Sequence, residues 1–276
     1  MSKMKFLLAV FALLLICSGC ANQSRIATDV QVTVLPVNTE TPKETAVSSP
    51  EPTVRPYQIS SVVEMAKGYK LTVPQLDGLS DKSIEDALNE QIRKDLLAMA
   101  GFSDQTTLPT DESAIDADAT FEQTFKVLLQ SNDVLSIAYS AYESYKGAAH
   151  PNNLYRTFTY DLSTGKSLAF SDCVTADESL IKLIREYQVP DGTDRDVVVE
   201  GVKYINENYD DQALITMLKS LDTSNTSATS FWKPGVLGLN LETIHVIGDY
   251  VQLELPLVYV EKSIRTDRDV CQKLLK

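Results

Sequence analysis

The sequence predicts an α+β fold in which antiparallel sheets carry helices on one side, preceded by a disordered tether. Several segments alternate apolar and polar residues, which is typical of half-buried strands. Other segments repeat apolar residues every three or four positions, as amphipathic helices do. The two kinds of segment come in blocks and not in strict alternation, a pattern that favours α+β over α/β.

Composition and charge narrow the class of protein. The chain has 276 residues, of which 43% are hydrophobic and 23% charged, as in ordinary globular proteins. Its 38 Asp and Glu residues outnumber 25 Lys and Arg residues, for a net charge of −13. Nucleic-acid binding requires a clustered basic surface, so we expect no nucleic-acid partner.

The N-terminal segment has the order of an export signal. Lys3 and Lys5 precede an apolar run over 6–16 that is too short to span a bilayer, and small residues follow it. The segment Cys17-Ser18-Gly19-Cys20 resembles a bacterial lipobox. The resemblance implies a signal peptide over 1–19 and a lipidated Cys20. It also implies an extracytoplasmic protein, lipid-anchored to the bacterial cell membrane.

A linker is predicted over residues 20–56. Thr and Pro recur in it, and no aromatic residue or glycine occurs between Ala21 and Pro56. Such a composition cannot bury a core, so this segment is expected to tether the folded part to the anchored Cys20.

Residues 57–119 form the N-terminal half of the folded part, with one strand and one helix. The strand is predicted at 69–73, and a turn with an N-cap follows at 78–83. Residues 102–118 are polar and acidic, and are interpreted as a surface loop. The helix is predicted up to about Gly101 from apolar residues four positions apart: Ile84, Leu88, Ile92 and Leu96.

Residues 120–276 form the C-terminal α+β half. The first predicted strands, an antiparallel meander, are 121–129, 134–145, 155–162 and 167–170. Capping boxes at 175–178 and 193–196 each open a predicted helix, and a further helical stretch covers 214–221. The closing strands are predicted at 230–236, 238–241 and 250–260.

The motifs of several enzyme classes are absent from the sequence. The two histidines, His150 and His245, have no zinc-site spacing, and no P-loop, nucleophile elbow or dinucleotide fingerprint occurs. Asp111, Asp116 and Asp118 lack the glycine and distal glutamate of a calcium loop. We therefore expect no metal, no cofactor and no catalysis. A carboxylate-dependent glycan hydrolase remains a less favoured alternative, because sequence cannot pair two acids across a cleft.

Two cysteines remain after the predicted signal is removed. Outside the cytoplasm Cys173 and Cys271 can form a disulfide, and two separate buried thiols are an equal alternative.

The densest group of unusual residues suggests a recognition loop. Tyrosine buries a ring and still offers a hydroxyl, which suits contact with a protein or a sugar. The alternative is that the tyrosines merely cover a sheet and that His150 makes a structural hydrogen bond. The candidate ligand-binding residues are Tyr142, Tyr145, Gly147, His150, Pro151, Asn152, Asn153 and Tyr155.

The same region resembles a known family. Residues 142–151, 157–162 and 164–166 are similar to the RsiV-like extracellular module of anti-sigma factors, which is also the non-catalytic part of PdaC-type deacetylases (families of domains of unknown function 3298 and 4163). Similarity at 73–79, 89–92, 231–241 and 251–259 extends the resemblance over about 57–264. The family's Gly-Gly-Ala-His-Pro loop is altered here to Gly147-Ala148-Ala149-His150-Pro151.

The resemblance implies a cell-surface lipoprotein with a non-catalytic binding module that recognises lysozyme or another cell-wall-active protein. Binding of peptidoglycan or another glycan is the alternative. We transfer neither sigma regulation nor deacetylation, because no cytoplasmic segment precedes the apolar run and no deacetylase domain follows the module.

Overall fold

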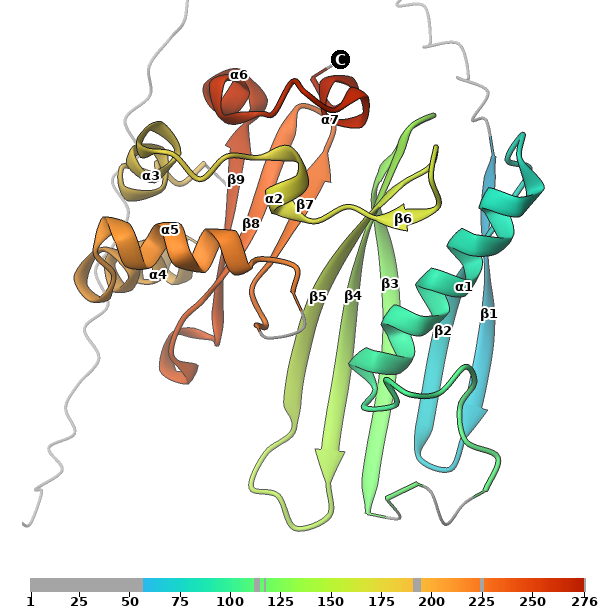
Figure 1. The fold of residues 1–276 in the computed structure, drawn as a ribbon. Coiled ribbons are helices and arrows are strands. Elements are labelled where there is room, and N and C mark those ends of the chain that lie inside the picture. Colours follow the sequence, from blue (N-terminus) through green and yellow to red (C-terminus); the bar gives the residue numbers. More distant parts are fainter. Residues whose placement is uncertain (1–56, 112–114, 117, 191–194, 224–225, 276) are drawn as a thin grey trace, which may run out of the picture. The chain divides into compact units, whose positions relative to one another are not determined.

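The computed structural model describes residues 57–111, 115–116, 118–190, 195–223 and 226–275 (Figure 1). The predicted signal peptide, the predicted lipidation site Cys20 and the predicted linker 20–56 lie outside the described residues. Thr193 and Asp194 of the second capping box also lie outside them. No described helix has both the length and the apolar character needed to cross a membrane.

A six-stranded sheet with the strand order β1-β2-β3-β4-β5-β6 forms the larger part of the fold (Figure 1). Its pairs are antiparallel except for β2 and β3, which run parallel with Tyr69 opposite Phe121. A parallel pair requires a crossover, and the segment containing helix α1 provides it. The strands are β1 (Gln58–Ala66), β2 (Tyr69–Asp77), β3 (Ala119–Gln130), β4 (Val134–Tyr145), β5 (Asn152–Asp161) and β6 (Lys166–Ser167).

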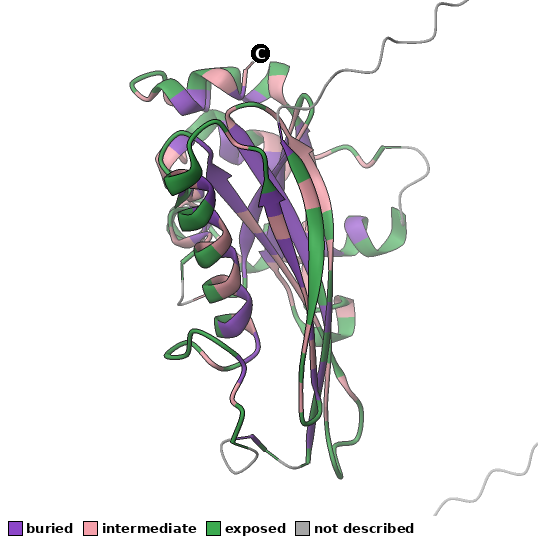
Figure 2. Ribbon diagram, turned by 90° about the vertical axis from the view of Figure 1, so that its right-hand side faces the viewer, coloured by how far each residue is buried: buried purple, intermediate pink, exposed green. Residues whose placement is uncertain are grey.

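Helix α1 (Lys82–Met99) covers one face of this sheet. Asp81 caps the helix by accepting hydrogen bonds from the backbone N–H groups of Ser83 and Ile84, and it satisfies donors that the first turn leaves open. Leu88, Ile92 and other apolar residues of its inner face are buried against the sheet, as the four-residue spacing predicts. Figure 2 shows the buried residues where helices face sheets and the exposed ones on the outer helix surfaces.

A three-stranded antiparallel sheet carries the second core. It consists of β7 (Thr229–Lys233), β8 (Val236–Glu242) and β9 (Tyr250–Pro256). Trp232 is buried in this core. The surrounding helices are α2 (Phe170–Cys173), α3 (Glu178–Arg185), α4 (Arg195–Asn208), α5 (Asp211–Ser220), α6 (Leu257–Val260) and α7 (Asp269–Lys273), with 3-10 turns η2 (His245–Ile247) and η3 (Glu261–Ser263).

Buried hydrogen bonds join the two sheets. Thr157 of β5 donates to the carbonyl oxygen of Ser230 in β7 at 2.8 Å, and the Trp232 N–H donates to the Ser136 hydroxyl at 3.2 Å. A disulfide between Cys173 and Cys271 links α2 to α7. Of the two alternatives for these cysteines, the structure has the disulfide and not two separate thiols.

The α+β class is confirmed, and several element boundaries need correction. Strand β1, which is mostly exposed and lacks clear alternation, is not predicted. The predicted strand 167–170 ends at Ser167, because Phe170 begins α2, and the predicted strand 250–260 ends at Pro256, where α6 follows. The capping box predicted at 175–178 places the N-cap at Thr175, and this is wrong. In the structure Asp177 caps α3 by accepting a hydrogen bond from the Leu180 N–H.

Candidate functional site

The candidate residues lie on the hairpin of β4 and β5 and on its connecting loop. In this hairpin Tyr142 pairs with Asn153. Tyr142 and Tyr145 are 48% and 42% exposed, although Tyr139 of the same strand is fully buried. Tyr139 therefore packs in the core, whereas Tyr142 and Tyr145 lie on the surface. Gly147 has a φ of 87°, a left-handed conformation that glycine adopts without strain.

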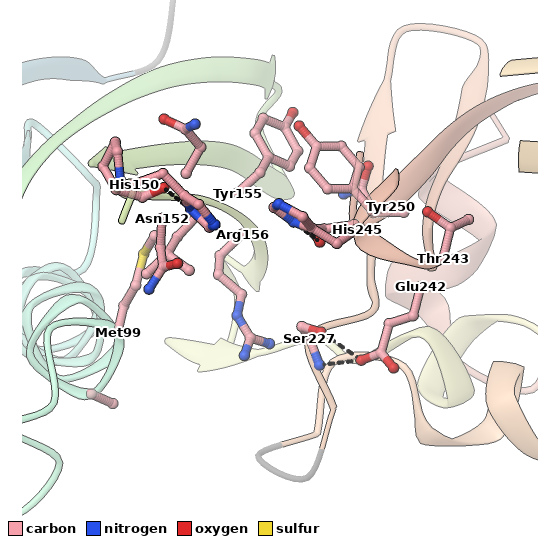
Figure 3. A pocket seen from close by; sticks show the side chains of 16 residues that line it. Met99, His150, Asn152, Tyr155, Arg156, Ser227, Glu242, Thr243, His245 and Tyr250 are labelled. Atoms are coloured by element: carbon pink, nitrogen blue, oxygen red, sulfur yellow. Dashed lines mark hydrogen bonds and ion pairs between the residues drawn. The ribbon is translucent and has the colours of Figure 1, made fainter. Parts of the chain in front are cut away.

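A cleft of about 560 Å³ lies beside this hairpin (Figure 3), within the size range of ligand pockets. The hairpin contributes five of the predicted residues: His150, Pro151, Asn152, Asn153 and Tyr155. Tyr142, Tyr145 and Gly147 are not among the residues that line it. The other lining residues are Ala98, Met99, Leu154, Arg156, Ser227, Asn240, Glu242, Thr243, His245, Asp249 and Tyr250.

Two aromatic pairs join the hairpin to the opposite wall. The rings of Tyr155 and Tyr250 stack with centroids 5.4 Å apart and an interplanar angle of 18°. The rings of His150 and His245 are 5.2 Å apart with an angle of 15°. Sequence reasoning missed His245 and Tyr250 as site residues because no local pattern connects them to the hairpin.

A short closed loop positions His245. The segment from Thr243 to Asp249 is closed by a 2.8 Å hydrogen bond from the Thr243 N–H to the Asp249 carbonyl oxygen. Gly248 and Asp249 both have positive φ, at 116° and 69°. Asp is among the few residues other than glycine that tolerate this conformation. In it, Asp249 Oδ1 lies 2.9 Å from His245 Nδ1.

Arg156 and Glu242 supply charge inside the cleft. Burial lowers the pKa of Arg156, an effect that the carboxylates of Glu242 and Asp222 oppose. One of its N–H groups donates to the Thr226 carbonyl oxygen at 2.5 Å. Glu242 accepts hydrogen bonds from the Ser227 hydroxyl and N–H and from the Thr226 hydroxyl, and these donors lower its pKa.

The chemistry of the cleft suits binding. Burial raises the pKa of Tyr155 to about 12, so its hydroxyl stays protonated. A glycosidase acid requires a raised carboxyl pKa, and that of Glu242 is shifted in the opposite direction. Among the described residues, no group of three or more His, Cys, Asp and Glu side chains is placed to hold a metal ion. The site offers aromatic rings, amides and one half-buried guanidinium.

The fold and the cleft thus define an α+β module of two packed sheets with a cleft beside the β4–β5 hairpin. Residues 59–153 match the family described as deacetylase PdaC, which confirms the predicted resemblance over this part of the chain. The matched segment runs from β1 through β4 and the β4–β5 loop, and it ends at the second residue of β5. No curated protein matches the chain.

Two solved structures are similar to the chain. One is a DUF3298 family protein from Pseudomonas aeruginosa PAO1, 16% identical, with 76% of this chain and 94% of that chain covered and a TM-score of 0.42. The other is a DUF3298 family member from Bacteroides fragilis NCTC 9343, 12% identical, with coverages of 80% and 97% and a TM-score of 0.47.

Proposed function

We propose that the chain is a non-catalytic binding module, anchored at the outer side of the cell membrane through lipidated Cys20, that recognises lysozyme or another basic cell-wall-active protein. The observation that carries this proposal is the exposure of large apolar side chains on the β4–β5 hairpin and on the η2 loop, whose His245 ring stacks on His150 of the hairpin loop. Tyr142 and Tyr145 lie on the hairpin, and Ile244 and Val246, which are 47% and 91% exposed, flank His245 on the opposite loop.

Exposed tyrosines are suited to protein recognition. They bury large ring areas with few rotatable bonds, and they are enriched among residues that dominate binding energy. Tyr145 also holds a carboxylate at this surface, because its hydroxyl donates to Glu143 at 2.8 Å. With a net charge of −13, the chain attracts a cationic partner, and this attraction weakens as salt increases.

The test is calorimetric titration of the full chain in detergent with a basic animal lysozyme at low and moderate salt. We expect saturable binding that weakens with salt. The variant Tyr142→Ala, Tyr145→Ala is expected to bind at least about tenfold more weakly, the cost of truncating a dominant contact. Tyr259→Ala is the matched control, since Tyr259 is 65% exposed on α6, at the opposite end of the β4–β5 strands from the connecting loop (Figure 1).

Two results would contradict this proposal. One is the absence of binding heat from a chain whose circular dichroism shows it folded. The other is an equal loss of affinity in the Tyr259→Ala control.

A second candidate function is recognition of a wall glycan inside the cleft. The stacked rings of Tyr155 and Tyr250, next to Asn152, Asn153 and Arg156, combine an apolar platform with directional hydrogen-bond donors, and sugars require both. Cosedimentation with purified peptidoglycan tests it. Binding through stacking is expected to persist in salt and to fail in Tyr250→Ala, whereas the hairpin variant Tyr142→Ala retains it.

A further inference from the structure

The fold brings together the only two histidines of the sequence. His150 lies on the loop between β4 and β5, and His245 begins η2 on the opposite side of the cleft. Their ring centroids are 5.2 Å apart (Figure 3). We propose that these two imidazoles bind one divalent transition-metal ion, with Zn²⁺ as the reference ion, at the mouth of the cleft.

Hydrogen bonding prepares both rings as ligands. His245 Nδ1 lies 2.9 Å from the Asp249 carboxylate, and His150 Nδ1 lies 3.4 Å from the Pro151 carbonyl oxygen. Metal-binding histidines characteristically donate one ring N–H to a carboxylate or a backbone carbonyl, which fixes the tautomer and raises the basicity of the other nitrogen. With the proton on Nδ1, the Nε2 atom of each ring is the available metal ligand.

The separation of the rings matches the requirement of one ion. Two imidazole nitrogens bonded at about 2.0–2.1 Å to a tetrahedral Zn²⁺ hold their ring centres about 5 Å apart. The ring planes are nearly parallel, at 15°, and both side chains are exposed. We therefore expect a rotation of these side chains to bring both Nε2 atoms to one ion. His245 has 71% of its side chain exposed, so this rotation displaces no core residue.

The protein provides two of the four ligands. Because no third His, Cys, Asp or Glu in the described part of the chain completes a cluster, the other positions fall to water or to a donor from a bound partner. Such an ion binds more weakly than one in a four-ligand structural site. Its effect is to clasp the β4–β5 loop to the η2 loop across the cleft.

Asp249 is a positioning residue in this proposal. Its left-handed φ of 69° is uncommon for a residue other than glycine, and such conformations cluster at functional sites. The conformation places the carboxylate on His245 Nδ1. Asp249→Asn keeps a residue type that tolerates this backbone but removes the charge, so metal affinity is expected to fall 10- to 100-fold.

The test is calorimetric titration of the full chain in detergent with ZnCl₂, in a Cys17→Ser, Cys20→Ser background. The other two cysteines are in the disulfide, so this background contains no free thiol to compete for zinc. We expect one ion per chain and a raised melting temperature. Both effects are lost in His150→Ala and, separately, in His245→Ala. Asp104→Asn, an exposed acidic control on another loop, binds as the parent does.

Cobalt gives a readout of the coordinating atoms. Co²⁺ in place of Zn²⁺ is expected to show visible absorption typical of nitrogen and oxygen ligands, and this absorption disappears in either histidine variant. The proposal is overturned by stoichiometric zinc binding that survives both histidine substitutions. It is also overturned by no binding at millimolar zinc to a chain that circular dichroism shows to be folded.

Discussion

Removal of the Cys173–Cys271 disulfide is predicted to destabilise the second core by several kcal/mol. The two cysteines are 98 residues apart in sequence, so the bond closes most of the C-terminal half into one loop. In the chain-entropy model a loop of about 100 residues contributes about 4.7 kcal/mol, and native disulfides typically contribute about 2–5 kcal/mol. Both sulfurs also lie in the buried cluster around Trp232, so substitution removes packing as well.

Urea unfolding measures this loss directly. Trp232 is the single tryptophan, and its burial in the same cluster makes its fluorescence a local reporter. The oxidised chain, the chain reduced with a thiol, and the Cys173→Ala, Cys271→Ala variant are compared. With a urea slope of about 2 kcal/mol/M, the loss lowers the midpoint by about 2 M.

The control separates this disulfide from the N-terminal cysteines. A Cys17→Ser, Cys20→Ser chain is expected to unfold as the parent does and to lose stability equally on reduction. Equal midpoints for the oxidised and reduced chains, with unchanged slopes, would refute the reasoning.

Three further predictions concern single positions. A Cβ on Gly238 would lie 2.0 Å from the buried Phe231 ring, so Gly238→Ala is expected to lower the free energy of unfolding by about 1–3 kcal/mol or more, measured in urea. The double variant Gly238→Ala, Phe231→Leu should lose less stability than the two single variants lose together, because the smaller side chain relieves the clash. Losses that are strictly additive would contradict the clash. Asp81→Ala removes the α1 cap and is expected to cost about 1 kcal/mol, whereas Ser80→Ala changes little. Burial raises the pKa of Asp222 to about 6, so the folded chain binds a proton that the unfolded chain releases near pH 4. Stability attributable to Asp222 therefore falls as pH rises from about 4 to about 6, and Asp222→Asn should flatten this part of the urea-midpoint profile; an unchanged profile would contradict it.

Local patterns predicted most individual elements because each depends on neighbours in sequence. The four-residue spacing from Ile84 to Leu96 requires a helix with one apolar face, and α1 forms there. Alternation likewise predicted β4 with both of its ends. Where local evidence was weak, prediction failed. Strand β1 is an edge strand with little burial, and Leu257 and Tyr259 continue an alternating pattern beyond the end of β9.

The candidate site also combines residues that local patterns predicted with residues that they did not. The sequence alone determined that Tyr142, Tyr145, His150 and their neighbours share one hairpin, because a hairpin is a local structure. Only the tertiary structure placed His245 and Tyr250 opposite that hairpin. It also decided the parallel pairing of β2 with β3 and the contact of Cys173 with Cys271. Contacts between segments that are distant in sequence depend on how whole sheets pack. The apolar periodicity within one segment does not specify which distant segment it contacts.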